Sequence, residues 1–262
     1  MMNKFIFPYH LVSESPWPLL GSLSLIIMMI GGVKMFFGLG SSLLILGYLV
    51  VIMVFKQWWR DVIRESTFQG AHTLKVMSGI RIGMLLFILS EVMFFISFFW
   101  CYFHMFLSPS VEIGGVWPPK GILVFDPYSI PLLNTLILLS SGVTITWAHY
   151  SLMSSKIKEV EVSILMTIFL GSVFIFFQFM EYKDSFFSIS DSVYGSIFFL
   201  ITGFHGFHVI MGVIFIFYSV VRIFSFHYTK IHHLGFEVAS WYWHFVDVVW
   251  LFLYLFVYWL SY

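Results

Sequence analysis

The stretch that decides the fold is residues 79–107, GIRIGMLLFILSEVMFFISFFWCYFHMFL, a long apolar run that holds one carboxylate, Glu91. A helix rises about 1.5 Å per residue and the hydrocarbon core of a bilayer is about 30 Å thick, so this run can cross a membrane. Glu91 lies ten residues after Arg81, about 15 Å along the helix axis, which places it near mid-membrane. We expect its carboxyl group to be protonated or paired with a polar group of another helix, and to face protein rather than lipid.

Small and polar residues recur every seven positions along the same run. They are Gly83, Ser90, Ser97 and His104, and Cys101 lies close to the stripe that they form. Residues seven apart lie on one face of a helix, and small side chains allow helices in membranes to approach closely. The pattern predicts that this seam faces the interior of a helical bundle.

The composition is that of an integral membrane protein. Of 262 residues, 60% are hydrophobic, 21% aromatic and only 10% charged, and the mean hydropathy is +0.95. This length accommodates about seven membrane spans with short connections and leaves no space for a separate soluble domain. Thirteen basic residues balance thirteen acidic ones, which argues against a nucleic-acid partner.

The chain has a single cysteine, Cys101, which excludes an intrachain disulfide framework and a cysteine-based metal cluster. The first residues show neither a secretory signal pattern nor an Arg-rich transit pattern. We therefore expect the first span to direct insertion into the membrane.

The apolar runs predict an all-α membrane protein with seven transmembrane helices. These helices are expected at about 17–37, 41–57, 79–107, 131–152, 160–181, 194–224 and 238–260. Residues 1–57 would hold a two-helix hairpin closed by Gly38-Leu39-Gly40, residues 58–78 a loop, and residues 79–262 a five-helix bundle.

The distribution of basic residues predicts the orientation. Ten lie on the side of the N-terminus: Lys4, Lys56, Arg60, Arg64, Lys75, Arg81, Lys156, Lys158, Arg222 and Lys230. Only Lys120 and Lys183 lie on the other side, and Lys34 falls within the first span. Because basic residues are enriched on the inner face, the N-terminus is expected inside and the C-terminus outside.

Two histidines, His205 and His208, lie one turn apart in the sixth run, TGFHGFHVIMG, where both rings could reach one metal ion. The flanking Gly203, Gly206 and Gly212 fit a close helix crossing instead, with the imidazoles bonded to neighbouring backbones. We favour this structural interpretation over a metal site. A di-haem cytochrome, which would need histidine pairs on facing helices, is a less favoured alternative.

His244 and Asp247 lie three residues apart in the seventh run, so their side chains can meet on one helix face. Pairing lowers the cost of placing Asp247 in the membrane, while a proton relay is the functional alternative. No titratable groups continue the pair through the span, which favours a structural role. An aromatic stripe on the same face, including Trp243, Trp250 and Tyr258, is typical of packing.

The stretch 56–75, KQWWRDVIRESTFQGAHTLK, combines Trp58 and Trp59 with clustered charges at the basic membrane face. Such residues fit a phospholipid headgroup site, to which Arg222 could contribute from the same side of the membrane. They fit an ordinary positive-inside anchor with interfacial tryptophans equally well. Spacing alone leaves both interpretations open.

Seven groups of motifs follow one another along nearly the whole chain: HLVSESPWPL, QWWRDVIRESTFQG, LFILSEVMFF with FFWCYFH, VWPPKGI, IPLLNTLILLSSGVTITWAH, SDSVYGSIFFLITGFHGFHVIMG and HHLGFEVASWYWHFVDVVWLFLY. Together they resemble the cytochrome c oxidase subunit III family of mitochondria. The resemblance implies a two-helix hairpin and a five-helix bundle that enclose a V-shaped, phospholipid-filled cleft. It also implies a place in the mitochondrial inner membrane, with the N-terminus in the matrix and the C-terminus in the intermembrane space.

The resemblance also assigns residues and partners. The buried glutamate of the family corresponds to Glu91, and its lipid-headgroup contacts correspond to Trp58, Glu65, His72 and Arg222. The chain departs from the family pattern at Ala71, before His72, and at Tyr150, where relatives often have histidine. Haem a and copper are expected in partner subunits and not in this chain, with the catalytic haem-copper subunit I as its neighbour.

The function that follows is a non-catalytic core subunit of the oxidase. It would support electron transfer from cytochrome c to oxygen, coupled to proton pumping, by stabilising the catalytic subunit and holding structural phospholipids. The alternative is a proton or solute transporter that uses Glu91 with the His244 and Asp247 pair. Inverted repeats and broken helices, which such transporters often have, are not visible in the sequence.

Overall fold

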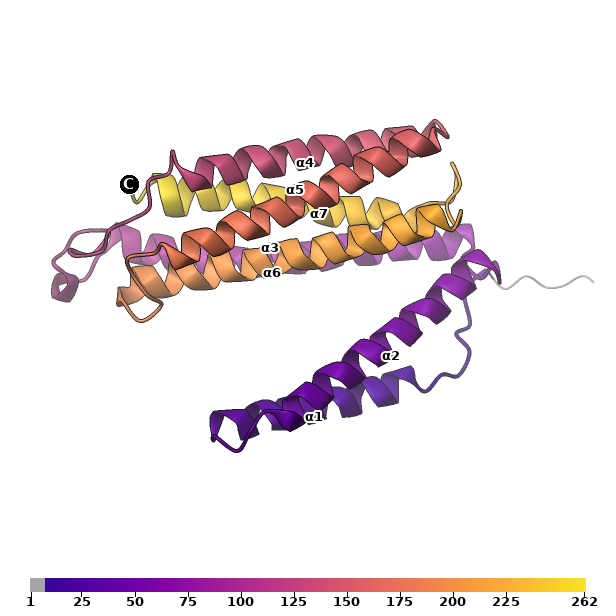
Figure 1. Cartoon of the computed structure of the whole chain (residues 1–262), viewed down its shortest axis with the longest axis horizontal. Coiled ribbons are helices and arrows are strands. Elements are labelled where there is room, and N and C mark those ends of the chain that lie inside the picture. The colour runs from indigo at the N-terminus through magenta and orange to yellow at the C-terminus, as the bar shows by residue number, and fades with distance from the viewer. Residues whose placement is uncertain (1–7) are drawn as a thin grey trace, which may run out of the picture. The chain divides into compact units, whose positions relative to one another are not determined.

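The computed structural model describes residues 8–262, which form seven α-helices and no β-strand. The helices are α1 (Trp17–Phe36), α2 (Ser42–Thr67), α3 (Leu74–Leu107), α4 (Ile130–Met153), α5 (Ile157–Lys183), α6 (Ser192–Phe224) and α7 (Leu234–Leu253) (Figure 1). A 3-10 turn (Val111–Ile113) follows α3, and a π-helical turn (Tyr254–Trp259) continues α7. Seven helices are long and apolar enough to cross a membrane, so the predicted all-α, seven-span fold is confirmed.

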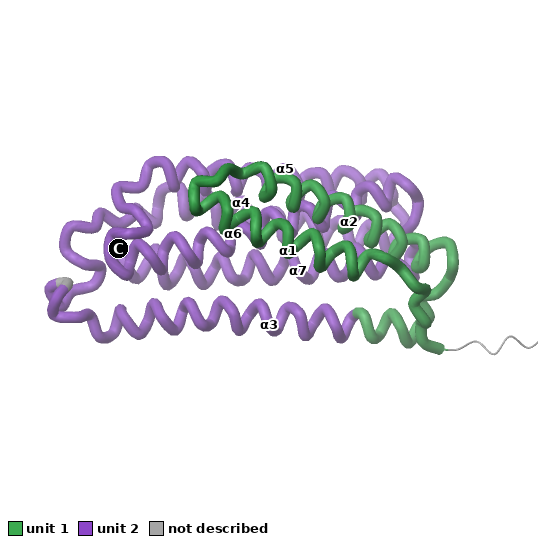
Figure 2. The backbone as a smooth tube through the Cα atoms, turned by 90° about the horizontal axis from the view of Figure 1, so that it is seen from below, with its two compact units in different colours: residues 1–80 green, residues 81–262 purple. Residues whose placement is uncertain are grey.

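The chain divides into two compact units, residues 1–80 (unit 1) and residues 81–262 (unit 2). Figure 2 shows that the division falls within α3, whose first turns belong to unit 1 and whose remainder belongs to unit 2. Unit 1 therefore contains α1, α2 and the start of α3. Unit 2 contains most of α3 together with α4 to α7.

In unit 1, α1 and α2 form the predicted hairpin. Gly38 and Gly40 adopt φ angles of +73° and +91° in the turn, which only glycine adopts without strain. Where the helices cross, a Cβ atom on Gly47 would lie 2.7 Å from Cα of Met28, and one on Gly31 would meet the backbone of α2. The two helix backbones are therefore in direct contact, as glycine allows in membrane helices.

The connection between α2 and α3 is shorter than the loop predicted over residues 58–78. The second helix continues to Thr67 and α3 begins at Leu74. The prediction ended the second helix at its first charged residues, but a helix can continue beyond the hydrocarbon where long charged side chains reach headgroups or water. Trp58, Arg60 and Glu65 consequently lie on a helix.

The core of unit 2 is organised around Trp243 of α7, whose indole is fully buried. It lies against α5 and α6 at two glycines, since Cβ atoms on Gly171 and Gly212 would come within 2.7 Å and 2.8 Å of its ring. Its Nε1 donates a hydrogen bond of 2.9 Å to the Ser141 hydroxyl of α4. One side chain therefore joins four helices. The predicted packing role of this aromatic stripe is confirmed, because Trp250 and Tyr258 are also buried.

The prediction for the small and polar seam of α3 is wrong. All five of its residues are exposed on unit 2: Gly83, Ser90, Ser97, Cys101 and His104. The buried face carries the aromatic residues Phe95 and Tyr102, which offer more packing area. Ser90 and Ser97 each donate a 2.6 Å hydrogen bond to a carbonyl of their own helix, so their hydroxyls need no partner helix.

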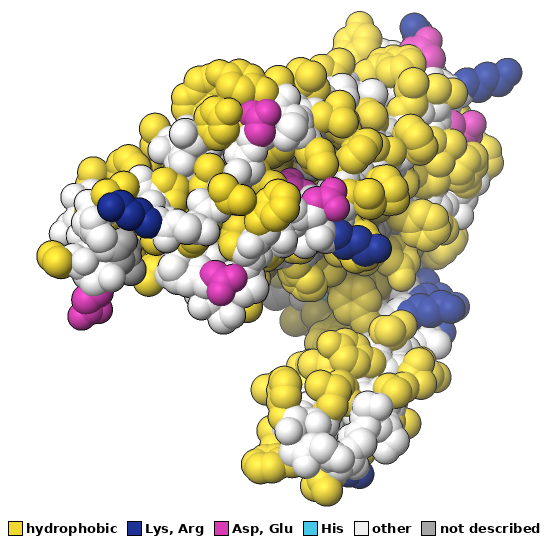
Figure 3. All heavy atoms as spheres, turned by 60° about the vertical axis from the view of Figure 1, so that its left-hand side comes forward, with side chains coloured by type: hydrophobic (Ala, Val, Ile, Leu, Met, Phe, Trp, Pro, Cys, Tyr) yellow, Lys and Arg dark blue, Asp and Glu magenta, His cyan; other side chains and the backbone are white. Residues whose placement is uncertain are grey.

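Apolar side chains dominate the visible surface of both units, and charged groups occur in a few places (Figure 3). In the most apolar 18-residue stretch of α3, only 6% of the residues are buried within the chain. The corresponding share in the last span, Leu234–Trp259, is 56%. A surface of this kind is suited to lipid or to the apolar helices of other membrane proteins.

Candidate functional site

A cavity in unit 1 brings together three of the four residues predicted to contact a lipid headgroup. Its volume is about 580 Å³, and its walls include Trp58 and Glu65 of α2 and His72 from the segment before α3. The extension of α2 past the hydrocarbon places Trp58 and Glu65 two turns apart on one helix face, because seven residues make about two turns. The prediction that these residues share a site is therefore consistent with the cavity.

The segment before α1 forms another wall of this cavity. His10 Nε2 lies 3.1 Å from Glu65 Oε2, and Trp17 Nε1 donates a 2.7 Å hydrogen bond to Asp61 Oδ2. Asp61 also accepts a 3.0 Å hydrogen bond from Arg60. These contacts fix the start of α1 to the charged end of α2. The sequence analysis missed His10 and Trp17, since nothing in their spacing connects them to α2.

The cavity wall carries charges of both signs. Carboxylates come from Glu14, Asp61 and Glu65, a guanidinium comes from Arg64, and imidazoles come from His10 and His72. A zwitterionic headgroup presents an ammonium group and a phosphate, which carboxylate and guanidinium groups respectively bind. Trp58 adds an aromatic wall of the type found at the membrane interface.

The fourth predicted residue, Arg222, lies in the last turn of α6 in unit 2. Its guanidinium carbon lies 4.4 Å from the ring centroid of Tyr228, a cation–π contact across the connection to α7. Burial raises the pKa of the Tyr228 hydroxyl, and the Arg222 charge opposes this shift. Gly235 leaves room for the guanidinium, because a Cβ there would overlap Nη1. The headgroup contact of Arg222 stays a prediction.

Glu91 has the polar partner from another helix that the sequence analysis expected. Its Oε2 lies 2.9 Å from Nε2 of His208 on α6. The other ring nitrogen, Nδ1, lies 2.6 Å from the Phe204 carbonyl, which can only accept, so Nδ1 carries a hydrogen. The Glu91 carboxyl and the Nε2 atom of His208 therefore form a polar contact that joins α3 to α6. The Glu91 side chain is 23% exposed and borders a cavity of about 340 Å³ lined largely by phenylalanines.

His205 is fully buried and lies one turn before His208. Its Nε2 is 3.2 Å from the Val246 carbonyl of α7, which confirms the predicted bond to a neighbouring backbone. The predicted close crossing occurs only at Gly212, because a Cβ on Gly206 would meet no heavy atom of the described chain within 4 Å. Within residues 8–262, no group of three or more His, Cys, Asp or Glu is placed to hold a metal ion.

His244 and Asp247 share one face of α7, with 3.9 Å between Nδ1 and Oδ2. This distance is too long for a hydrogen bond. The Asp247 carboxyl lies against α4, where a Cβ on Gly142 would be 2.9 Å from Oδ2. Asp247 is buried while the His244 side chain is 41% exposed, so the pair spans the edge of the bundle.

The structure also contains a buried carboxyl group that the sequence analysis missed. Glu181 of α5 is 1% exposed, and its Oε1 accepts a 2.7 Å hydrogen bond from the Tyr258 hydroxyl. Glu181 lies near the end of its helix, where a charged residue is usually solvated, so its position gave no signal of burial. Gln178, one turn earlier on the same helix, was the available indication of an inward polar face.

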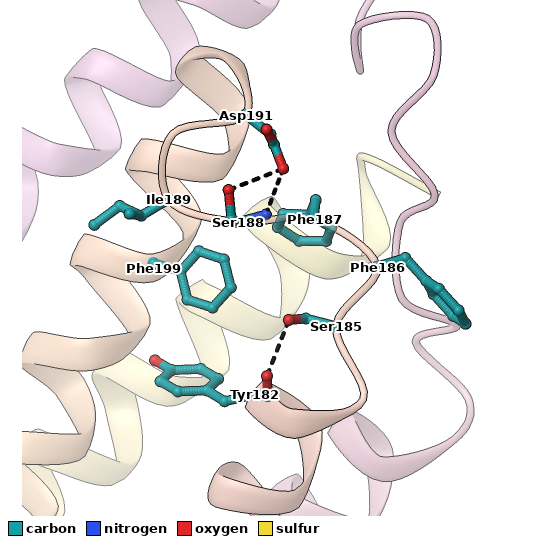
Figure 4. Close-up of a pocket in the computed structure, with 8 residues that line it drawn as sticks. All are labelled: Tyr182, Ser185, Phe186, Phe187, Ser188, Ile189, Asp191 and Phe199. Carbon is teal, nitrogen blue, oxygen red and sulfur yellow. Dashed lines mark hydrogen bonds between the residues drawn. The ribbon is translucent and has the colours of Figure 1, made fainter.

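A further cavity of about 610 Å³ adjoins the connection between α5 and α6 (Figure 4). Its aromatic walls include Tyr182, Phe187 and Phe199. Asp191 accepts hydrogen bonds from the backbone and hydroxyl of Ser188, at 2.8 Å and 2.9 Å. These bonds lower the pKa of the Asp191 carboxyl. No residue predicted to be functional lies in this cavity.

Comparison with known proteins identifies the family. A family model described as cytochrome c oxidase subunit III matches residues 7–262. The chain belongs to the cytochrome c oxidase subunit III family. It is 54% identical over 253 residues to cytochrome c oxidase subunit 3 of Pisaster ochraceus, covering 96% of this chain and 97% of the relative. The Arabidopsis thaliana protein is 55% identical over 253 residues, and the Drosophila melanogaster protein 53% over 252, each with 96% of both chains covered.

The predicted family is thereby confirmed. As a subunit III protein, the chain is a multi-pass membrane subunit of cytochrome c oxidase and acts in a complex with other oxidase subunits.

Proposed function

We propose that this subunit III supports the oxidase without a catalytic centre of its own. It braces the catalytic haem-copper subunit I and holds phospholipids beside it, while haem a and copper are bound by partner subunits. The roles of the buried histidines support this proposal. His205 is bonded to a backbone carbonyl and His208 to Glu91, so both rings already contribute to helix packing.

The observation that carries the lipid proposal is the mixed-charge cavity of unit 1. Trp58, Glu65 and His72 line it together with Arg64 and His10. We propose that a zwitterionic phospholipid places its ammonium group near Glu65 and its phosphate near the guanidinium and imidazole groups. Arg222 is proposed to contact a headgroup from the same side of the membrane.

Native mass spectrometry of the purified oxidase tests this proposal by counting bound phospholipids. Glu65→Gln removes the negative charge with little change of shape, and Glu112→Gln is the matched control on an exposed carboxylate outside the cavity. We expect Glu65→Gln to retain fewer zwitterionic lipids than the control. Equal lipid content in both variants would exclude Glu65 as a headgroup contact.

We also propose that the subunit lies in the mitochondrial inner membrane, with its N-terminus in the matrix and its C-terminus in the intermembrane space. The distribution of Lys and Arg supports this orientation, since ten lie on the N-terminal side and two on the other. Protease treatment of mitoplasts that carry a tag at either end tests it. The C-terminal tag should be removed and the N-terminal tag protected, and the reverse pattern would contradict the orientation.

The transporter alternative receives less support. A relay would need Glu91 to connect with the pair formed by His244 and Asp247. In the described part of the chain, no hydrogen bond joins these groups, and Glu91 is bonded to His208 instead. Oxygen reduction by a Glu91→Gln variant separates the two functions, because only a relay through Glu91 requires its carboxyl group.

A further inference from the structure

Two tryptophans of α7 differ in their hydrogen bonding although both are buried. Trp243 and Trp250 lie seven residues apart on one helix face and are 0% and 1% exposed. The indole Nε1 of Trp243 donates to the Ser141 hydroxyl. The Nε1 atom of Trp250 has no acceptor among the described residues. An unpaired N–H group inside a membrane protein is costly, so this difference calls for an explanation.

The residue level with Trp250 on α4 is Asn134. Two contacts, Ser141 with Trp243 and His149 with His233, show that α4 and α7 run in opposite directions. Asn134 lies seven residues before Ser141 on α4, and Trp250 lies seven residues after Trp243 on α7. Because the two helices are antiparallel, both steps cover the same distance in the same direction, so Asn134 and Trp250 lie at the same height in the bundle. Asn134 is 0% exposed. Neither its amide oxygen nor its amide nitrogen is bonded to the described chain.

Helix α5 brings two more polar side chains to this level. The hydrogen bond between Thr144 and Thr167 sets α5 antiparallel to α4, which brings Gln178 close to the level of Asn134. The Gln178 amide is buried and approaches the Tyr258 hydroxyl, but neither of its polar atoms makes a hydrogen bond of regular geometry in residues 8–262. Gln178 also lines a cavity of about 270 Å³ whose walls are formed by residues of α5 and α6.

Glu181 and Tyr258 complete the group. Glu181 Oε1 accepts the Tyr258 hydroxyl hydrogen, whereas its Oε2 is buried and unpaired within the described residues. The Tyr258 ring centroid lies 5.8 Å from that of Trp250. Helices α4, α5 and α7 with its π-helical turn therefore enclose four side chains with unpaired polar atoms: Asn134, Gln178, Glu181 and Trp250. We refer to these four residues and Tyr258 as the inner polar cluster.

The chemistry of this cluster selects its ligand. The indole and amide N–H groups would repel a bare cation, and a carboxyl oxygen would repel an anion when ionised. Water both donates and accepts, and a buried water typically makes about three hydrogen bonds to such groups. We propose that the inner polar cluster binds internal water molecules that bridge Asn134 to Trp250 and Gln178 to Glu181. This site is separate from the proposed lipid site and does not depend on it.

Radiolytic footprinting of the purified oxidase tests the proposal, because a short X-ray pulse converts bound water into hydroxyl radicals that oxidise adjacent side chains. Trp250 and Tyr258 should be oxidised although they are 1% and 2% exposed, and Trp243 should be oxidised several-fold more slowly. Trp243 is the matched control, since it is equally buried and its N–H is bonded to protein. Equal oxidation of Trp243 and Trp250, or oxidation of neither, would overturn the proposal.

A variant then locates the water. Asn134→Leu replaces the amide by an apolar group of similar size, and it should lower Trp250 oxidation several-fold. Oxidation of Tyr128, which is 59% exposed in the connection before α4, should be unchanged. Unchanged Trp250 oxidation in this variant would contradict the bridge. If the variant does not assemble, rapid mixing of the unmodified oxidase with H₂¹⁸O before the pulse decides the question. Tyr128 should take up ¹⁸O at once and Trp250 should still take up ¹⁶O, whereas simultaneous ¹⁸O uptake would show bulk solvent instead of internal water.

Discussion

Replacing Gly212 by alanine should disturb the packing of Trp243 in the core of unit 2. The new Cβ would lie 2.8 Å from Cε3 and 3.1 Å from Cζ3 of the indole. The ring cannot move away, because its far edge already packs closely against Gly171 of α5. The contact is so close that a Cβ on Gly171 would lie 2.7 Å from the ring. Movement would also break the hydrogen bond to Ser141.

The expected loss follows from two opposing effects. Adding a methyl group to a filled core typically costs about 1–3 kcal/mol. Alanine regains about 0.5–1 kcal/mol over glycine inside a helix. The two ranges leave a net loss of about 0–2.5 kcal/mol. At the middle of this range, a little over about 1 kcal/mol, Gly212→Ala should lower the folding equilibrium constant about 5–10-fold.

Gly206→Ala is the matched control on the same helix. No heavy atom in the described residues lies within 4 Å of its added Cβ, so only the helix-propensity gain remains and stability should be unchanged or slightly higher. Both variants would be unfolded with SDS in mixed micelles while tryptophan fluorescence and helical circular dichroism are followed. Equal midpoints for the two variants would refute the role assigned to the glycine contacts of Trp243.

Three further predictions concern separate parts of the chain. A hydrophobic carbodiimide should label Glu91, which borders an apolar cavity, while Glu91→Gln should leave initial oxygen reduction nearly intact; abolished turnover would indicate a proton path. The pKa of Asp191 is lowered by its bonds to Ser188, so its stabilisation of the loop is present above about pH 4 and is lost as the pH falls further. Amide exchange at Ser188 should accordingly be faster in Asp191→Asn at pH 7, and the difference from wild type should shrink as the pH falls through the lowered pKa of Asp191; equal rates at pH 7 would contradict this role. Gly47→Val should separate α1 from α2 because its Cβ would lie 2.7 Å from Cα of Met28, and unchanged proteolytic resistance of the hairpin would argue against this contact.

The number and type of the helices could be predicted from the sequence because membrane spans depend on local hydropathy over about 20 residues. The ends of the helices could be predicted less well from the sequence. Charged residues such as Arg60 and Arg64 ended the predicted second helix, although interfacial helices tolerate them. The seam of α3 was assigned to the wrong face because small residues permit packing without requiring it, and Phe95 and Tyr102 supply more contact area.

Some residues of the candidate sites could be predicted from the sequence and others could not. Glu91 could be recognised because a carboxyl group in the middle of a span has few explanations. Its partner His208 could not be assigned from sequence, since the contact joins helices 117 positions apart. The inner polar cluster was missed for a related reason. Asn134, Gln178 and Glu181 are unremarkable in sequence, and only the register between α4, α5 and α7 brings them together.

The central claim is that this subunit preserves the oxidase by bracing it and holding its lipids. The most direct measurement is oxygen consumption over many turnovers by purified oxidase with the subunit present, with it removed, and with Trp58 and Glu65 replaced by Leu and Gln. The account predicts similar initial rates in all three preparations. It predicts faster loss of activity per turnover without the subunit, and an intermediate loss in the double variant. Identical decay in all three preparations would contradict it.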